Sequence, residues 1–204
     1  MAVADRYELL GVIGSGGMAT VWRARDLQLD RLVALKRPHP APPDSDVYVR
    51  FEREARLAAA VNHPNLVAVY DVGRDAEGPF LVMELVDAPS LAAVPADPSR
   101  AARTGAEIAA GLAALHAHDI VHRDVKPANV LLARDGAKLT DFGIARAADS
   151  TTLTQPGLTH GTPAYAAPEV FAGAPPSPAS DVYSLAAVVF EVLTGTRAHA
   201  GQVA

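Results

Sequence analysis

The chain has 204 residues, half of them apolar, and a formal net charge of −5 at pH 7; this length allows one domain or two lobes with a sizeable core. The net negative charge and the lack of a long basic run argue against nucleic acid or an anionic membrane surface as the main partner. Without cysteine there is no disulfide or thiolate zinc site, and we expect neither a signal peptide nor a membrane span, since the best apolar run, 185–193, is short.

Residues 7–36 show the pattern of three antiparallel strands, with turns at 14–19 and near Asp30. Glycines in the first turn allow the backbone to approach a ligand closely and to direct amide groups at phosphate oxygens. An ordinary hairpin loop explains the same glycines. Lys36 ends the third strand, where it is either a solvated surface residue or a ligand of phosphate.

A helix is predicted from about residue 46 to Val61, with Asp44 and Ser45 as candidate N-caps. Apolar residues recur along it at helical spacing, with charged faces between them. Glu54 lies on the same side as apolar Phe51, although a surface pair with Arg50 is also compatible with the spacing.

Residues 66–72 and 79–86 are predicted as two further strands, which complete a five-stranded sheet. A helix follows to about His118, with Ser99 as its predicted cap and an apolar face that belongs to the core. His116 and His118 could form a metal pair. Because no carboxylate or cysteine stands near them, favourable placement at the helix C-terminus is the better explanation.

Two short apolar runs, 130–133 and 137–140, are predicted to pair as a hairpin through a turn at 134–136. The polar loops before and after the hairpin then emerge at the same end. Together they supply two carboxylates, an amide and an ammonium group. Such a set suits phosphoryl transfer, in which the protein positions a nucleophile, holds a divalent metal and neutralises charge. The four residues are Asp124, Lys126, Asn129 and Asp141.

The run His122-Arg123-Asp124, with Asn129 and with Asp141-Phe142-Gly143, resembles the catalytic and metal loops of protein kinases. Lys126, two residues after Asp124, resembles the Ser/Thr form, and the whole is similar to the bacterial Ser/Thr kinases. The resemblance implies an α+β, bilobal fold with a five-stranded antiparallel N-lobe that carries one helix, and a mainly helical C-lobe. The implied divisions are an N-lobe at 7–86, a hinge at 87–90 and a partial C-lobe at 91–204.

The resemblance also implies roles for individual residues. Asp124 would accept or orient the substrate hydroxyl proton, Lys126 would steady the γ-phosphate of ATP, and Asn129 with Asp141 would hold Mg²⁺. Lys36 would meet the α and β phosphates, held there by an ion pair with Glu54. Thr162 would hydrogen-bond Asp124 and Lys126 and favour Ser/Thr acceptors. The implied nucleotide-binding residues are Ile13, Gly14, Ser15, Gly16, Gly17, Met18, Ala19, Thr20, Val21, Ala34, Lys36, Met83, Glu84, Val86 and Leu131.

Ala19 departs from the family pattern, because it stands where the third glycine of the loop is expected. Its methyl group would restrict a positive φ and crowd the loop, which hints at weaker nucleotide binding. Arg123 would meet a phosphate on the threonine-rich segment that follows Gly143, and this predicts autophosphorylation with self-association of the chain. The predicted acceptors are Thr151, Thr152 and Thr154.

The segment 161–169 resembles the substrate-docking and Ala-Pro-Glu motifs, which small-molecule phosphotransferases lack. Ser180 and Asp181 are predicted to cap a buried helix that stops at Gly195, and Asp181 matches the aspartate that holds the catalytic loop. The family pattern calls for further helices after Ala204, so we expect a truncated kinase. Glu169 would then lack its arginine partner, at a cost of about 3 to 5 kcal/mol if buried, and the helix at 182–193 would expose apolar area.

The sequence therefore predicts a Ser/Thr protein kinase that uses ATP and Mg²⁺ and acts on Ser/Thr hydroxyls of proteins. One alternative is a catalytically impaired, truncated kinase or a pseudokinase-like scaffold that binds nucleotide. A small-molecule phosphotransferase is a third possibility, disfavoured by residues 161–169. The expected location is the cytoplasm, either for a free protein or for the cytosolic part of a membrane-anchored one.

Overall fold

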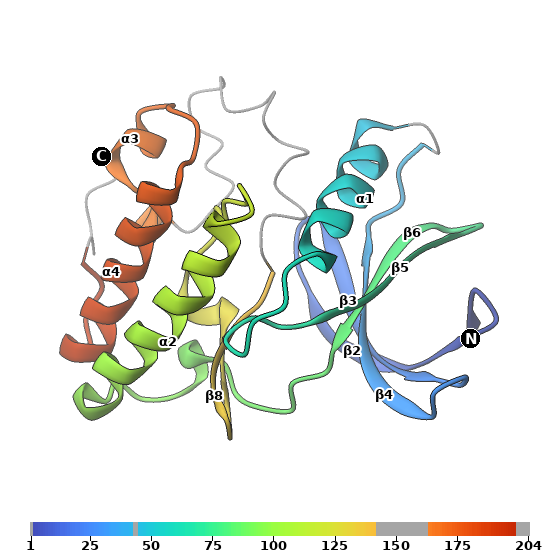
Figure 1. The fold of residues 1–204 in the computed structure, drawn as a ribbon, viewed down its shortest axis with the longest axis horizontal. Coiled ribbons are helices and arrows are strands. Elements are labelled where there is room, and N and C mark those ends of the chain that lie inside the picture. Colours follow the sequence, from blue (N-terminus) through green and yellow to red (C-terminus); the bar gives the residue numbers. More distant parts are fainter. Residues whose placement is uncertain (1, 43–44, 142–162, 199–204) are drawn as a thin grey trace. The chain divides into compact units, whose positions relative to one another are not determined.

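The computed structural model describes residues 2–42, 45–141 and 163–198 (Figure 1). The chain divides into two compact units. Within the described residues, the first unit comprises 2–62 and 67–86, and the second comprises 63–66, 87–141 and 163–198. Each unit has its own helices and strands.

The first unit is built on an antiparallel sheet of six strands in the order β1-β2-β3-β4-β6-β5. The five expected strands are present, and a two-residue strand at the N-terminus pairs with β2 as a sixth. This extra strand was not predicted, since two residues are too few to show an alternating pattern. The strands are β1 (Ala2–Val3), β2 (Tyr7–Ser15), β3 (Ala19–Asp26), β4 (Arg31–Pro38), β5 (Val69–Asp75) and β6 (Gly78–Glu84).

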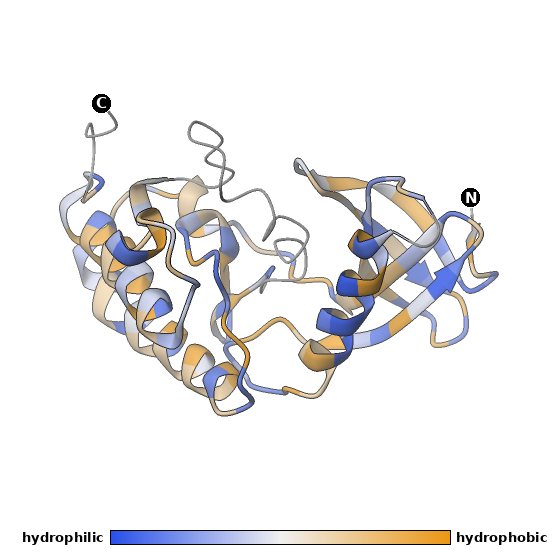
Figure 2. Cartoon of the chain, turned by 90° about the horizontal axis from the view of Figure 1, so that it is seen from above, coloured by the Kyte–Doolittle hydropathy of each residue, from blue (hydrophilic) through white to orange (hydrophobic). Residues whose placement is uncertain are grey.

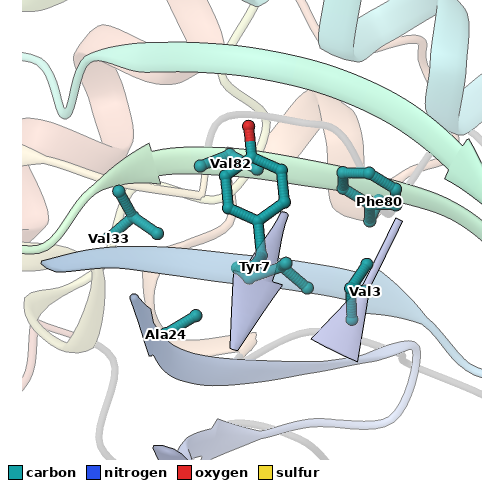
Figure 3. Packing of buried hydrophobic residues seen from close by; sticks show 7 residues of the cluster. Val3, Tyr7, Ala24, Val33, Phe80 and Val82 are labelled. Atoms are coloured by element: carbon teal, nitrogen blue, oxygen red, sulfur yellow. The ribbon is translucent and has the colours of Figure 1, made fainter. Parts of the chain in front are cut away.

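A cluster of buried side chains covers one face of this sheet (Figure 3). Tyr7 and Phe80 meet edge to face, with ring centroids 5.8 Å apart, an arrangement that aromatic pairs favour. Phe80 also fills the space over Gly73, where any added side chain would collide with its ring. Trp22 packs against the edge of the cluster, which comprises Val3, Tyr7, Ala24, Val33, Leu35, Phe80 and Val82.

The helix α1 (Asp46–Ala59) packs against β5 and β6. Its turns alternate between hydrophobic and hydrophilic colours in Figure 2, as expected for a helix with one face on a sheet. Phe51 and Ala55 are buried on that face. Ser45 occupies the N-cap position as predicted, but its side chain makes no capping hydrogen bond.

In the second unit, two long helices pack against each other, and the first of them also packs on a hairpin. Ile108, Leu112 and Leu115 on the first helix are fully or almost fully buried. The elements are η1 (Leu91–Ala93), α2 (Pro98–His116), η2 (Pro127–Asn129), β7 (Val130–Ala133), β8 (Gly136–Leu139), η4 (Pro163–Tyr165), α3 (Pro168–Phe171) and α4 (Pro178–Thr194).

Three boundaries in this unit differ from the prediction. Asp97, not Ser99, caps α2 by accepting from the Ser99 N–H. Ser177, not Ser180, caps α4, and Ser180 completes a capping box with it. The hairpin turn is one residue shorter than expected, because Gly136 already pairs with Ala133. The stop at Gly195 is confirmed, since this residue has the left-handed φ of 71° that a helix end favours.

Two expectations about surfaces have different outcomes. The prediction that α4 exposes apolar area is confirmed, since Val182, Phe190 and Leu193 are 57%, 44% and 48% exposed. Glu169 is itself exposed. Because it is hydrated, the predicted cost of a buried carboxylate without a partner does not arise.

Candidate active site

The turn in front of Asp124 is held by a buried carboxylate from α4. Asp181 is 1% exposed; it accepts the backbone N–H of His122 at 2.7 Å and that of Arg123 at 2.9 Å. The ring of His116 lies 2.9 Å from the same carboxylate. Arg123 has a φ of 67°, which costs energy for a residue with a side chain. Asp181 therefore fixes a strained turn, the role that the resemblance implied for it.

The ring of His122 is fully buried beneath this turn. Its Nδ1 accepts the backbone N–H of Asp124 at 3.2 Å, and its Nε2 lies 3.0 Å from the carbonyl oxygen of Thr140. Since Nδ1 is an acceptor, the proton of a neutral ring must be on Nε2, from which it donates to Thr140. Burial lowers the pKa of His122, despite the nearby Asp181. The neutral imidazole thus ties the turn before Asp124 to the end of the hairpin.

One carboxylate oxygen of Asp124 accepts hydrogen bonds from both Lys126 and Asn129. The Lys126 ammonium donates to Oδ2 of Asp124 at 2.8 Å, and the Asn129 amide donates to the same oxygen at 3.1 Å. Asn129 also donates to the Asp124 backbone carbonyl at 2.9 Å. Two donors from different directions fix the plane of the carboxylate. Three of the four polar residues predicted around the hairpin are therefore in direct contact.

The hairpin of β7 and β8 connects Asn129 to Asp141. Val130 pairs with Leu139, and the Thr140 N–H donates to the Asn129 carbonyl at 2.9 Å. Asp141 follows at once, half-buried and with a φ of 61°. The pairing brings the chain just before Asn129 and just after Thr140 to one end of the hairpin, as predicted.

The chemistry of Asn129 and Asp141 fits Mg²⁺. The side-chain nitrogen of Asn129 donates its hydrogen bonds to Asp124. Its amide oxygen therefore has the chemistry of a Mg²⁺ ligand, as does the Asp141 carboxylate. Mg²⁺ is commonly held by one or two carboxylates together with substrate phosphates, not by a protein cage. Among the described residues, there is no group of three or more His, Cys, Asp and Glu that could hold a metal ion.

The predicted phosphate loop forms the turn between β2 and β3 in the first unit. Gly14 pairs with Val21 and Ser15 with Thr20, and the Gly16 N–H donates to the Ala19 carbonyl at 3.0 Å. Ala19 is buried at the start of β3 and does not have a positive φ. The backbone at Ala19 therefore does not need the positive φ that its methyl group would restrict. Ile13 lies in β2, and Gly17 and Met18 lie in the turn itself.

Lys36 and Glu54 lie in the same unit. Lys36 is 5% exposed in β4, opposite Val21 on β3. Glu54 is half-buried on α1. Ala34 faces Met83 across β4 and β6, and Glu84 ends β6, with Val86 in the chain beyond it. Leu131 lies in β7 of the second unit.

Several predicted residues lie outside the described part of the chain. They are Phe142, Gly143, Thr151, Thr152, Thr154 and Thr162. Arg123, the predicted partner of a phosphothreonine, is exposed in the described part. The suspected histidine metal pair is not formed, because His116 contacts Asp181 and His118 lies 2.9 Å from the carbonyl of Ala114.

The chain matches the sequence model of one protein family along almost its whole length. Residues 7–203 match the model of the protein kinase domain. The chain belongs to the protein kinase family. The match covers both units and includes every residue of the candidate site.

Curated bacterial kinases resemble this protein kinase domain along 94–95% of the chain. Serine/threonine-protein kinase PknB of Mycobacterium leprae is 45% identical, PknL of Mycobacterium tuberculosis 43% and PrkC of Bacillus subtilis 41%. The matched parts make up 33%, 50% and 31% of those proteins, so the chain spans a third to a half of their length. In the described residues, no helix combines the length and the apolar character that a membrane crossing requires.

The structural roles of three residues at this site were not predicted from the sequence. His116 contacts Asp181, and Asn65 and Glu107 bind the backbone of β8. A carboxylate in the middle of an alanine-rich helix was a signal for Glu107. No sequence pattern indicated the strand to which Glu107 binds, because that partner is 30 residues away.

Proposed function

We propose that the chain is a Ser/Thr protein kinase domain that transfers the γ-phosphoryl group of ATP to Ser/Thr hydroxyls of proteins. The observation that carries the proposal is the contact of Lys126 and Asn129 with one oxygen of Asp124, at 2.8 and 3.1 Å. An oriented carboxylate beside an ammonium group suits an acceptor hydroxyl on one side and a phosphoryl group on the other. The Ser/Thr kinase names of the relatives support the same function.

In the proposed reaction, the acceptor hydroxyl oxygen forms a bond to the γ-phosphorus of ATP. The bond from that phosphorus to the β–γ bridging oxygen breaks, and ADP leaves with its electron pair. Asp124 orients the hydroxyl and takes its proton. Lys126 neutralises charge on the moving phosphoryl group. Asp181 and His122 keep the turn before Asp124 in place throughout.

Asn129 and Asp141 are the proposed ligands of Mg²⁺, which neutralises charge on the phosphates when bound. Lys36 is the proposed ligand of the α and β phosphates, with Glu54 as its partner. The glycine turn after β2 would cover the phosphates, and the backbone at Glu84 and Val86 would bind adenine. Because ATP is a cytoplasmic metabolite, we propose that the domain works in the cytoplasm.

Autophosphorylation within residues 151–154 is a second part of the proposal. Arg123 is exposed directly before Asp124, and a guanidinium binds phosphate strongly in two-point geometry. Incubation with ATP and Mg²⁺ should add phosphate to Thr151, Thr152 or Thr154, measured by intact mass and peptide mapping. An active enzyme with these threonines unmodified contradicts this part.

The test of the main proposal is transfer from radiolabelled ATP to a generic basic protein in the presence of Mg²⁺. We expect label on serine and threonine of the acceptor. Asp124→Asn should lower the rate by about 10² to 10⁴, the usual range for loss of a general base, and should leave the folded state intact because the amide is isosteric. Circular dichroism of the variant is the control for folding.

A thermal-shift titration with Mg-ATP distinguishes the alternatives. A ligand at 100 times its Kd stabilises the folded state by about 2.7 kcal/mol. Stabilisation without transfer selects the nucleotide-binding scaffold. Transfer to small hydroxyl compounds, with none to protein, selects the small-molecule phosphotransferase.

A further inference from the structure

In the hairpin, both backbone polar groups of Ala137 are hydrogen-bonded by side chains from outside the hairpin. The Ala137 N–H donates to Oε2 of Glu107 on α2 at 2.7 Å. The Ala137 carbonyl accepts from the Asn65 side chain at 2.9 Å. The Asn65 carbonyl in turn accepts the Leu139 N–H at 2.9 Å. Strand β8 is therefore fixed along its length, and not only by its pairing with β7.

Glu107 is well suited to hold this strand. Its other oxygen, Oε1, accepts from Arg103 Nε at 2.8 Å, one turn earlier on α2. The Glu107 side chain is 22% exposed, whereas that of Arg103 is 72% exposed. Burial raises the pKa of Glu107, but the Ala137 N–H and the Arg103 guanidinium outweigh burial and lower that pKa overall. Glu107 thus remains a charged acceptor, and hydrogen bonds to charged groups are the stronger kind.

The carboxylate also explains the glycine beside it. Gly136 has a φ of 133°, and a side chain there would come within 3.2 Å of Oε1 of Glu107. A Cβ atom at 136 would thus be in tight contact with Glu107, in addition to the backbone strain of the positive φ. The start of β8 at Gly136 therefore packs closely against Glu107 on α2.

The hairpin determines where the two proposed metal ligands lie. Asn129 directly precedes β7, and Asp141 follows β8 after one residue, with the Thr140 N–H bonded to the Asn129 carbonyl. The Asn129 side chain is also held by hydrogen bonds to Asp124. A shift of β8 along α2 that disturbs its pairing with β7 would therefore move Asp141 relative to Asn129.

We propose that Glu107 is a positioning residue for the metal site, acting through Ala137 and the β7–β8 hairpin on Asn129 and Asp141. This inference rests on the proposed function, because it assumes that these two residues hold Mg²⁺. Partners outside the ligand set change metal affinity by about 10- to 100-fold when they are mutated. Glu107 makes no contact with ATP or metal in this scheme, so its effect is on ligand geometry.

The experiment measures metal binding directly, with Mn²⁺ as the probe and ADP present, by electron paramagnetic resonance. Glu107→Ala should weaken Mn²⁺ binding by about 10-fold or more. Glu107→Gln retains an oxygen that can accept the Ala137 N–H, and should restore most of the affinity. Arg103→Ala is the matched control, since it removes the ion pair but leaves the bond to the strand, and should have a small effect. Hydrogen exchange of residues 133–141 should be faster in Glu107→Ala.

If Glu107→Ala does not fold, Glu107→Asp replaces it, because the shorter side chain keeps the charge but cannot reach Ala137 equally well. Unchanged Mn²⁺ affinity in the folded variant overturns the inference and leaves the proposed function intact. Equal weakening by Glu107→Ala and Glu107→Gln also overturns it, because the loss then does not follow the hydrogen bond. Absence of Mn²⁺ binding by the unmodified chain overturns both the inference and the proposed metal site.

Discussion

His122 shows how a single buried side chain couples the candidate site to pH. Burial lowers the pKa of its ring below the ordinary value of 6.5. As pH falls through about 6.5 the ring of the unfolded chain takes up a proton, whereas the ring of the folded chain does not. The unfolded state then binds more protons, so the free energy of unfolding falls. With respect to His122, the free energy of unfolding has its full value above about pH 6.5. Below that pH it falls by at most about 1.4 kcal/mol per pH unit.

Urea unfolding at pH 7.5, 6.5 and 5.5 checks this prediction. The unmodified chain should lose stability between pH 6.5 and 5.5 more steeply than His122→Asn, which has no ring to titrate. His118→Asn changes an exposed histidine and should follow the unmodified chain. If the curves of all three proteins run parallel, His122 is not the source of the pH dependence.

At this scale the sequence predicted the residues that form motifs, and Asp181 among those that support them, but it missed the supporting role of Glu107. Asp124, Lys126 and Asn129 are close in the chain, and local geometry was enough to bring them together. Glu107 had an equally good partner in Arg103 one turn away. Its additional bond to Ala137 depends on how α2 packs against β8, and no local pattern encodes that packing.

At the scale of elements, the strands and the long helices were predicted, but two helix starts were wrong for a common reason. Asp97 and Ser177 each stand directly before a proline, at the first position of α2 and of α4. The predicted caps, Ser99 and Ser180, are the first serines after these prolines. Proline suits the first turn of a helix, because its fixed φ is helical and its missing N–H would have no partner there.

The capping box of α4 gives a prediction for a whole element. Ser177 accepts the Ser180 N–H at 3.3 Å, and the Ser177 N–H donates to the Ser180 hydroxyl at 2.8 Å. Ser177→Ala removes the cap and should lower the free energy of unfolding by about 1 kcal/mol. Ser184→Ala is the matched control. Its hydroxyl binds the carbonyl one turn earlier within the same helix, so its loss should be neutral or slightly stabilising. Equal effects of both changes on the urea midpoint would rule out capping as the cause.

At the scale of the whole molecule, each of the two units has its own buried side chains. In the first unit, Phe80 is 3% exposed and lies in the cluster beside Trp22. In the second, Leu112 is 2% exposed on α2, which packs against α4 and β8. The sequence located the second set from the helical periodicity of its apolar face, whereas for the first unit it predicted the strands but not the cluster that they bury. It could not show how the long-range contacts divide between the units, because that division depends on contacts between residues far apart in the chain.

Separate cores predict separate responses to mutation. Trp22, the only tryptophan of the chain, reports on the first unit by fluorescence. Far-UV circular dichroism reports chiefly on the second unit, because α2 and α4 have 19 and 17 residues and α1 has 14. Phe80→Ala should lower the stability seen by Trp22 by about 3 to 5 kcal/mol, with a smaller change in the dichroism transition. Leu112→Ala should do the reverse, at about 2 to 5 kcal/mol. If both probes shift together in both variants, the molecule unfolds as one cooperative unit, and the division into two independently stable cores is wrong.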